Sequence, residues 1–495
     1  MTSIEKFQKL KTDLIELAVR GKLVEQRQEE GTAQELYEKI QKERQKLISE
    51  GKLKKEKQLP EISEDESPFE IPKSWIWTRC SNVFNFHLGK TPPRNESKNW
   101  GGSINWVSIS DISASKNGII KETKEYITRD AFEDTFNNVI SPKNTLVMSF
   151  KLSIGKVAFL GINAVHNEAI ISIFPIIKDS SEEIFKKYLF HILPLISKLT
   201  ESTSAIKGKT LNKEKISKML LPLPPLEEQK RIVESLEAKF KVIDKAIALL
   251  ERKTDLDKKI KEKILQLAIQ GKLVEQKTEE GTAHELYEKI QQERQILISE
   301  GKLKKEKLLP EILEDEIPFE IPKSWKWLRI RDLVVQAKQS KPISNFKYID
   351  VSAIDNDKKI VGTLLEYSAK DAPSRARKMV EPGMILFSTV RPYLVNTIIY
   401  NDNVNKTPVY ASTAFATFSC SRIIYNRFLW YILQSTYFIE YTISCQKGIS
   451  YPAINESSFY SCFVPVPPLE EQRRIVARIE QLFNIIDSQI VKQDI

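Results

Sequence analysis

The sequence has few of the residues on which disulfide-stabilised and metal-dependent proteins rely. Its 495 residues include only four cysteines and four histidines. No two cysteines stand at Cys-x-x-Cys spacing, and the histidines are scattered along the chain. This pattern predicts neither a disulfide framework nor a zinc site, and it indicates a protein of the reducing cytoplasm.

Long apolar runs and cofactor-binding motifs are missing as well. No stretch reaches the roughly 18 apolar residues of a membrane span, and the first residues do not resemble a secretion signal. The segment HLGKT (87–91) lacks the upstream glycine of a P-loop. The segment TPPR (91–94) is not the Asp/Asn-Pro-Pro-aromatic loop with which amino-methyltransferases hold a flipped base. We therefore expect no catalytic residue, no cofactor, no metal and no membrane contact in this chain.

Negative charge is in the minority. Lysine and arginine number 76 against 66 aspartates and glutamates, which gives a net charge of +10. Such a surplus favours a polyanionic partner, because each phosphate that a basic side chain neutralises releases counterions. The surplus alone does not decide the matter, since many soluble proteins carry one without binding nucleic acid.

Two internal repeats are the main feature that the sequence does have. Residues 21–75 return as 271–325 with 47 of 55 positions identical, and residues 222–240 return as 465–483 with 12 of 19 identical. The inserts that follow the first pair of blocks share little sequence. Blocks that stay alike while inserts diverge indicate one shared task for the blocks and a different task for each insert. Homogenisation of the blocks by gene conversion is the alternative explanation.

The two ends of the chain fall inside the same pattern. The first repeat aligns Met1 with position 251, and the second aligns Ile495 with position 252. The chain therefore looks like two units of a ring that is opened within a helix. This arrangement predicts a pseudo-twofold molecule with neighbouring termini.

A long helix is predicted on both sides of that junction. Residues 226–270 contain neither Gly nor Pro, and Pro225, Glu227 and Glu228 suit a helix N-terminus. We expect the continuous helix 225–270 to pack antiparallel against a helix assembled from 467–495 and 3–20. Apolar residues at heptad steps form the expected seam: Val233, Leu236, Phe240, Ile243, Ile247, Leu250, Ile260, Ile264 and Leu267, facing Val476, Ile479, Phe483, Ile486 and Ile490, and Leu10, Leu14 and Leu17.

Shorter elements are predicted around this helix. Each repeated block should contain a helix that begins with a capping box, Thr32 with Glu35 and Thr282 with Glu285. In the inserts, apolar runs bounded by turns predict strands, and longer apolar segments predict a helix near the end of each insert. The expected strands are 104–112, 156–162, 169–177, 383–390 and 396–400, and the expected helices are 181–196 and 423–443.

Together these patterns predict an α+β fold with two globular domains separated by a long antiparallel two-helix coiled coil, with internal pseudo-twofold, circular symmetry. The expected divisions are 1–20, the N-terminal part of the split distal helix; 21–75, the first repeated helical connector; 76–221, the first insert domain; 222–270, the central helix; 271–325, the second connector; 326–464, the second insert domain; and 465–495, the C-terminal part of the distal helix.

Polar side chains suited to DNA gather at the predicted turns of both inserts. Arg and Lys match guanine edges and phosphates, Asn and Gln match adenine, and Tyr can stack or wedge. Any one of these loops can equally be ordinary surface, although loops concentrate function. The candidates are Lys90, Thr91, Arg94, Asn95, Lys151, Ser153, Lys156, Lys207, Lys209 and Asn212 in the first insert, and Arg375, Arg377, Ser388, Arg391, Tyr393, Gln446, Lys447, Tyr451 and Asn455 in the second.

Several motifs, in this order and spacing, resemble those of one family. They are PLPPLEEQKRIV (222–233) with PVPPLEEQRRIV (465–476), the twin GKLVEQ segments, the PFEIPKSW segments and FSTVRPYL (387–394). Over essentially the whole chain they resemble the specificity subunit of type I restriction–modification enzymes. The first insert departs from this pattern, because MSFKL (148–152) stands where FSTVRPYL would be expected.

The resemblance implies a DNA-recognition subunit without catalytic activity of its own. Each insert would be a target-recognition domain for one half of a split double-stranded sequence, with the helices fixing the separation. Two adenine-specific methyltransferase subunits would dock on the helices, and restriction subunits would join them. These partners would use S-adenosylmethionine, ATP and magnesium. The docking residues implied are Leu226, Glu228, Gln229, Arg231, Leu469, Glu471, Gln472 and Arg474.

Two other functions remain open at this point. A coiled-coil scaffold that binds only proteins would show no salt-dependent affinity for DNA. A stand-alone methyltransferase or nuclease would need a cofactor loop that the sequence does not contain.

Overall fold

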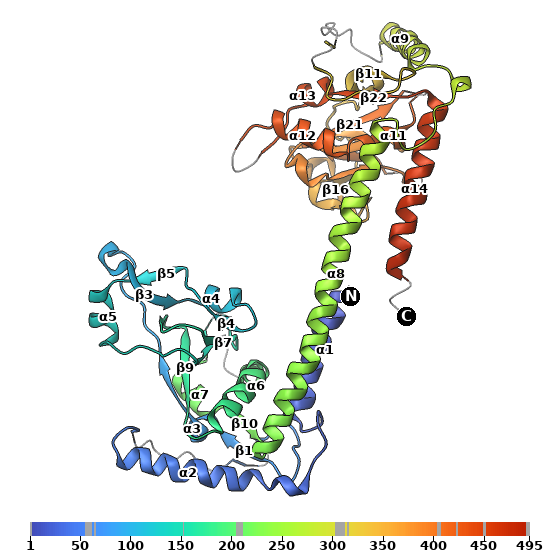
Figure 1. Ribbon diagram of the computed structural model, residues 1–495. Coiled ribbons are helices and arrows are strands. Elements are labelled where there is room, and N and C mark those ends of the chain that lie inside the picture. The colour runs from blue at the N-terminus through green and yellow to red at the C-terminus, as the bar shows by residue number, and fades with distance from the viewer. Residues whose placement is uncertain are drawn as a thin grey trace. The chain divides into compact units, whose positions relative to one another are not determined.

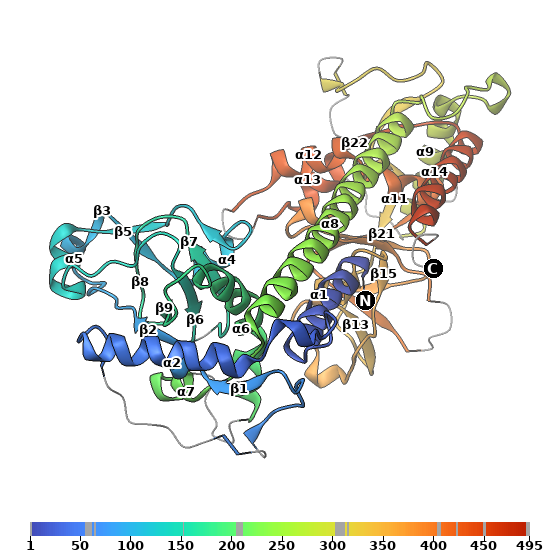
Figure 2. The ribbon, with the colours of Figure 1, turned by 60° about the horizontal axis from the view of Figure 1, so that its bottom comes forward.

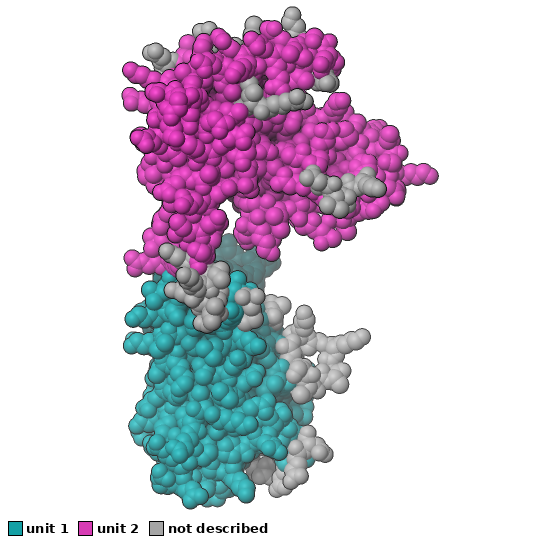
Figure 3. All heavy atoms as spheres, turned by 90° about the vertical axis from the view of Figure 1, so that its right-hand side faces the viewer, with its two compact units in different colours: residues 1–250 teal, residues 251–495 magenta. Residues whose placement is uncertain are grey.

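A computed structural model describes residues 2–54, 62–63, 66–151, 153–203, 211–301, 312–313, 316–402, 407–421, 424–448 and 452–491. The chain divides into two compact units, Met1–Leu250 and Glu251–Ile495, which we call unit 1 and unit 2 (Figure 3). None of the helices within the described ranges combines the length and the apolar character of a bilayer span.

Unit 1 begins and ends with helices that enclose a mixed α+β insert (Figure 1). Its helices are α1 (Ser3–Val19), α2 (Ala33–Ser49), α3 (Cys80–Val83), α4 (Ile109–Ala114), α5 (Arg129–Phe136), α6 (Glu182–Thr203), α7 (Lys213–Lys218) and α8 (Leu226–Ile269), which continues into unit 2. Its strands are β1 (Ile76–Arg79), β2 (Phe84–Leu88), β3 (Trp100–Val107), β4 (Ile119–Ile120), β5 (Glu125–Ile127), β6 (Leu146–Ser149), β7 (Val157–Leu160), β8 (Val165–His166), β9 (Ile170–Pro175) and β10 (Leu220–Leu223).

Unit 2 repeats this sequence of elements with local differences. Its helices are α9 (Ala283–Ser299), α10 (Ile330–Leu333), α11 (Asn426–Ile432), α12 (Thr436–Cys445), α13 (Glu456–Ser461) and α14 (Leu469–Val491), with the 3-10 helix η8 (Pro392–Leu394). Its strands are β11 (Lys326–Arg329), β12 (Val334–Gln336), β13 (Phe346–Ile349), β14 (Ile354–Asp355), β15 (Ile360–Val361), β16 (Glu366–Tyr367), β17 (Ala376–Val380), β18 (Ile385–Ser388), β19 (Thr397–Ile399), β20 (Val409–Ser412), β21 (Phe415–Cys420) and β22 (Phe463–Val466).

The two inserts share one strand order, apart from an extra edge strand in each, although their sequences differ. The first sheet runs β2-β9-β6-β7-β4 in unit 1 and β12-β21-β18-β19 in unit 2, so β4 is extra in unit 1. The second sheet runs β5-β3-β8 in unit 1 and β16-β13-β20-β17 in unit 2, so β17 is extra in unit 2. A parallel pair lies at the same place in both, β3 with β8 and β13 with β20. The antiparallel pairs β1–β10 and β11–β22 close the two inserts.

An internal strand of the first sheet in each unit, β6 or β18, is apolar throughout because both of its faces are buried. Successive side chains of a strand point to opposite faces of the sheet. In β6, Leu146 and Met148 belong to the main core of unit 1, and Val147 belongs to a smaller core on the other face. In β18, Phe387 and Leu386 are divided between two cores in the same way. The strand expected at 383–390 is therefore present as β18, whereas β6 was not among the expected strands.

The helices of each unit pair in an antiparallel manner. In unit 1, Lys11 of α1 contacts Asp244 of α8, whereas Gln26, which follows α1, contacts Glu228 at the start of α8. Both ribbon views place α1 beside this part of α8 (Figure 1, Figure 2). In unit 2, Lys261 of α8 contacts Asp487 of α14 at 2.7 Å. Helix α8 itself is unbroken from Leu226 to Ile269.

The expected seam is present only in part. Val233, Leu236 and Ile243 are buried, as are Val476 and Ile479 of α14. Leu10 and Leu17 are 43% and 39% exposed, so their assignment to the seam was wrong, and Ile260 is 48% exposed. Helix α1 contacts α6 as well as α8, and the face that it buries carries Leu14 and Ala18. The side chain of Ile490 lies outside the described residues.

Three local predictions also need correction. The strand expected at 104–112 ends at Val107, because Ser108 begins α4 and its N–H donates to Asp111 Oδ2 at 2.8 Å. The single helix expected at 423–443 is two helices, since Ser435 caps α12 after α11 has ended. Thr282 and Glu285 form the expected capping box, whereas Thr32 makes no side-chain capping bond.

Candidate nucleic-acid interface

The predicted DNA-contacting segments of unit 1 converge on one turn. The N–H of Phe150, after β6, donates to the carbonyl of Ala169 in the β8–β9 turn at 2.9 Å. The N–H of Leu211, before α7, donates to the carbonyl of Phe150 at 3.1 Å. The N–H of Gly89, after β2, donates to the carbonyl of Ile170 at 3.0 Å. Segments 89–95, 150–156 and 211–212 therefore form one group of loops, which we call the unit 1 loop cluster.

Unit 2 repeats the first two of these hydrogen bonds and adds a third of its own. The N–H of Thr389, after β18, donates to the carbonyl of Ala414 in the β20–β21 turn at 2.8 Å. The N–H of Ile454, before α13, donates to the carbonyl of Thr389 at 2.9 Å. The N–H of Thr413 donates to the carbonyl of Arg375 at 2.9 Å. Segments 372–378, 388–395 and 446–455 thus form the unit 2 loop cluster, of which 449–451 are outside the described residues.

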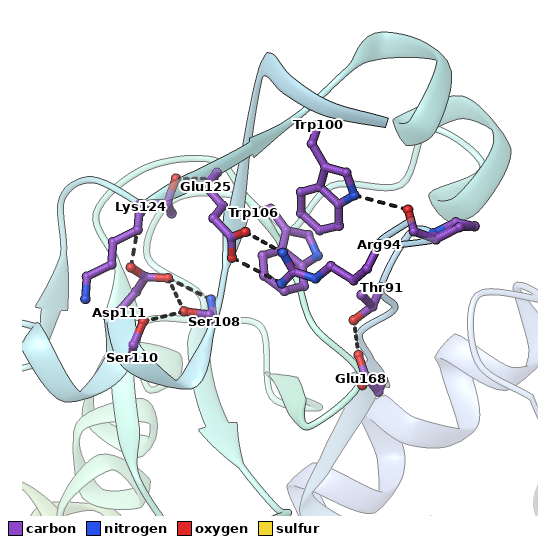
Figure 4. Close-up of polar contacts among 12 residues, drawn as sticks. Thr91, Arg94, Trp100, Trp106, Ser108, Ser110, Asp111, Lys124, Glu125 and Glu168 are labelled. Atoms are coloured by element: carbon purple, nitrogen blue, oxygen red, sulfur yellow. Dashed lines mark hydrogen bonds and ion pairs between the residues drawn. The ribbon is translucent and has the colours of Figure 1, made fainter. Parts of the chain in front are cut away.

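In the unit 1 loop cluster, an ion pair and two tryptophan rings hold the side chain of Arg94 (Figure 4). Its guanidinium makes a two-point ion pair with Glu125, with one N–O distance of 3.1 Å. It also lies 4.0 Å from the ring centre of Trp100 and 4.7 Å from that of Trp106. The indole N–H of Trp106 donates to the carbonyl of Lys90 at 3.1 Å, so this group fixes the loop as well. An arginine held in this way presents its edge in one orientation, with part of its charge already compensated.

Glu168 places an acid among the basic side chains of the same cluster. The hydroxyl of Thr91 donates to it, and this bond holds the pKa of Glu168 below its ordinary value, with help from Lys151 and Arg94. An ionised carboxylate in such a place can accept a hydrogen bond from the amino group of cytosine. Sequence reasoning missed Glu168, because nothing in the local sequence links it to Thr91.

Other candidates of unit 1 are engaged locally. Lys90 Nζ donates to the carbonyl of Thr135 at 2.7 Å, and Lys156 Nζ donates to Ser113 Oγ at 2.6 Å. The side-chain oxygen of Asn212 caps α7. Asn95 is exposed and Ser153 is half-buried. Lys207 and Lys209 lie outside the described residues.

In unit 2 one candidate is ruled out by burial. Ser388 is 1% exposed, and its hydroxyl donates to the carbonyl of Val390 at 2.9 Å, so the expectation that it contacts DNA is wrong. Arg377 Nη1 donates to the adjacent carbonyl of Ala376, and Asn455 caps α13. The remaining candidates comprise the exposed Arg375, Arg391, Tyr393 and Lys447, the half-buried Gln446, and Tyr451, which lies outside the described residues.

The expected docking residues of unit 1 are largely buried within the chain. Glu228 is 1% exposed and accepts a 2.8 Å hydrogen bond from the indole N–H of Trp75, and burial raises its pKa. Gln229 is fully buried and donates to the carbonyl of Pro224 at 2.9 Å. Arg231 forms an ion pair with Glu30. Leu226 is half-buried against the core.

Unit 2 repeats these contacts residue for residue. Glu471 is 1% exposed and accepts from the indole of Trp325 at 3.0 Å, and Gln472 is fully buried. Arg474 forms an ion pair with Glu280, and Leu469 is half-buried. The buried acids Glu228 and Glu471 therefore join each repeated block to its helix, whereas Gln229 and Gln472 donate to prolyl carbonyls just before their own helices. Because all four side chains are buried within the chain, their assignment as contacts for a partner subunit was wrong, and exposed neighbours must supply any such surface.

Comparison with known proteins agrees with this architecture. The family model "Type I restriction modification DNA specificity domain" matches residues 72–265 and 322–493. The EcoAI specificity subunit of Escherichia coli is 27% identical in an alignment covering 96% of this chain and 88% of that protein. The EcoEI specificity subunit of the same organism is 26% identical, covering 97% of this chain and 89% of that protein.

The fold has a relative among solved structures. A chain from a study of complex assembly and conformational transition in a type I restriction–modification system aligns with a TM-score of 0.50 and 18% identity, covering 86% of this chain and 94% of that one. At that identity the likeness concerns the fold alone. From the two matched regions and the full-length relatives, the chain belongs to the family of type I restriction–modification specificity subunits.

Proposed function

We propose that the chain binds a bipartite double-stranded DNA target, with one half-site on each loop cluster, and performs no catalysis itself. The observation that carries this proposal is the repetition of one strand order and one set of loop hydrogen bonds in the two units, with different side chains on the loops. A shared backbone framework with unlike side chains is what two different half-sites require, since base edges are distinguished by side-chain chemistry.

Helix α8 would set the separation of the half-sites. It passes from unit 1 into unit 2 without a break, and 44 residues at 1.5 Å per residue give a length of about 66 Å. Together with α1 and α14 it would form the antiparallel two-helix coiled coil of a pseudo-twofold molecule, with 76–221 and 326–464 as recognition domains. Half-sites on one face of B-DNA lie about 34 Å, or a multiple of it, apart.

Two methyltransferase subunits would dock on equivalent surfaces of the helical regions. Exposed residues recur at the same repeat positions, Glu227 and Lys230 in unit 1 and Glu470 and Arg473 in unit 2. Val242 and its repeat equivalent Ile485 are also exposed, by 69% and 49%. Exposed apolar side chains rimmed by charge are typical of protein interfaces. Restriction subunits would join through the methyltransferases, and S-adenosylmethionine, ATP and magnesium would be used by these partners.

Methylation mapping of DNA from cells that express the chain with its methyltransferase tests the proposal. We expect methylated adenines within one split motif that has a gap of fixed length and variable sequence. A chain that acts only as a protein scaffold would instead give methylation without any such motif, and its affinity for DNA would not fall steeply with salt.

A further inference from the structure

The hairpin loop between β18 and β19 has an unusual backbone. Arg391 and Val395 both have positive φ, 48° and 52°, on either side of the short helix η8. A β-branched residue such as valine rarely adopts this conformation, because its side chain crowds the backbone. The corresponding loop of unit 1, between β6 and β7, places its positive φ at Gly155, where no such crowding arises.

Contacts from several directions keep this strained loop in place. Asn356 Nδ2 donates to the carbonyl of Leu394 at 2.7 Å, and Lys359 Nζ donates to the carbonyl of Val395 at 2.6 Å. From another side, the N–H of Arg391 donates to the carbonyl of Pro452 at 2.8 Å. Strained backbone persists where the surroundings over-determine it, and such places are often functional.

The loop presents two adjacent apolar side chains to solvent. Tyr393 is 43% exposed and Leu394 is 44% exposed, whereas Pro392, which precedes them in η8, is buried. Exposed Arg391 precedes the pair, and exposed Lys447 lies across the loop cluster, joined through the bridges Lys447–Ala453 and Ala453–Val390. An apolar tip beside cationic side chains is the combination that DNA-bending proteins insert between base pairs.

We propose that Tyr393 and Leu394 form a wedge that enters between two adjacent base pairs of the half-site bound by unit 2. The wedge unstacks that step and kinks the duplex, and Arg391 and Lys447 hold the neighbouring phosphates. The inference deepens the proposed function and rests on it. Because the loop is already rigid, little conformational entropy is lost when the tip enters the DNA.

The wedge has a consequence for the sequence that unit 2 recognises. Unstacking is easiest at pyrimidine–purine steps such as TA and CA/TG, and a wedge therefore selects sequence by deformability without reading base edges. The half-site of unit 2 should contain such a step at a fixed position. Among the described residues of segment 150–156, which do not include Leu152, no corresponding pair of exposed apolar side chains occurs, and the wedge is proposed for unit 2 alone.

The test uses the full chain in complex with its methyltransferase and duplexes that carry the methylation-mapped target. The fluorescent base analogue 2-aminopurine replaces, in turn, each adenine of either half-site other than the methylated ones, which the methyltransferase itself takes out of the stack. Binding should raise its fluorescence at one step of the unit 2 half-site and at none of the unit 1 half-site. Tyr393→Ala with Leu394→Ala should abolish that rise and weaken binding by about tenfold. Tyr393→Phe should retain both.

Leu365→Ala is the matched control, since Leu365 is 67% exposed in unit 2 and is not part of the loop cluster. It should leave fluorescence and affinity unchanged. The wedge is overturned if the native complex binds without any rise, or if the double variant keeps the rise. It is also overturned if the double variant no longer binds the methyltransferase but the DNA bound to the chain still shows the rise in 2-aminopurine fluorescence. Failure of the native complex to bind the mapped target would instead contradict the proposed function.

Discussion

The two loop clusters share two backbone hydrogen bonds and differ in how their side chains are held. In unit 1, an ion pair and two tryptophan rings fix Arg94, and Gly155 adopts the positive φ of the hairpin loop. In unit 2, a strained loop presents Tyr393 and Leu394. Backbone bonds between turns therefore preserve the position of a loop while its side chains diverge. We propose that each unit contacts DNA by a different physical means on this framework.

The largest expected difference between the units is their response to acid. His166 and His191 of unit 1 are 4% and 7% exposed, and burial lowers the pKa of each to about 4, whereas His284 of unit 2 is exposed. The unfolded chain binds these protons near pH 6.5, but folded unit 1 does so only near pH 4. Unit 1 should therefore lose stability as the pH falls through this window, by about 3 kcal/mol for each histidine.

Urea unfolding between about pH 7.5 and about pH 4.5 measures this loss. His166→Gln with His191→Gln should flatten the dependence of unit 1 on pH, and His284→Gln should change nothing. A steep dependence that survives in the double variant would show that the buried histidines are not its cause.

The next largest effect is the loss of stability when the buried glutamate of a repeated motif is removed, and it should be equal in the two units. Glu228→Ala removes the acceptor of the Trp75 indole and of Gln26, and should lower the free energy of unfolding of unit 1 by about 2 to 3 kcal/mol. Glu471→Ala should destabilise unit 2 similarly. The exposed neighbour Glu227 provides the control, and Glu227→Ala should have little effect on thermal unfolding. Equal melting temperatures for Glu227→Ala and Glu228→Ala would contradict the conclusion that the buried contacts of Glu228 stabilise unit 1.

A smaller difference should appear in the salt dependence of DNA binding. Replacing a lysine that contacts phosphate lowers the slope of log affinity against log salt by about one, so Lys447→Ala should show this change. Arg94→Ala should change the slope less, because Glu125 already compensates part of its charge. Fluorescence anisotropy titrations at several salt concentrations measure both slopes. Equal slopes for the two variants would mean that the Arg94–Glu125 pair opens on binding.

The smallest effect concerns the strained hairpin. Val395→Gly should relieve backbone strain and raise the free energy of unfolding of unit 2 by about 1 kcal/mol. At the equivalent loop of unit 1, Gly155→Val should do the opposite, because a Cβ there would lie 3.1 Å from the carbonyl oxygen of Pro194. Thermal unfolding compares the two. A loss of stability in Val395→Gly would show that packing of the valine outweighs the strain.

Features that depend on neighbouring residues were predictable from the sequence. The extent of α8 follows from the absence of Gly and Pro, and the strands β7 and β18 follow from short apolar runs. The break before α12 was missed, because Ser435 acts as a cap only once the preceding helix has ended. Such competition between neighbouring elements is decided by tertiary packing more than by local propensity.

The candidate site was predictable only as a set of loops. Polar residues at turns marked the segments that the structure brings together, but their pairing with Glu168 or Glu125 is a contact between distant segments. The buried Glu228 and Glu471 were mistaken for docking residues because repetition of a motif does not reveal whether its contacts lie inside the chain. The repeated Trp75 and Trp325 were the available indication, since each block retains a buried donor for the buried acid of its helix.

We propose that α8 holds two unlike loop clusters at a fixed separation along DNA. Deleting residues 252–255 shortens the helix by about 6 Å and turns one end by about 40° relative to the other. Methylation mapping with this variant tests the claim most directly. The account predicts the same two half-sites with a different gap between them, or no methylation at all. Methylation of the original sequence with its gap unchanged would contradict it.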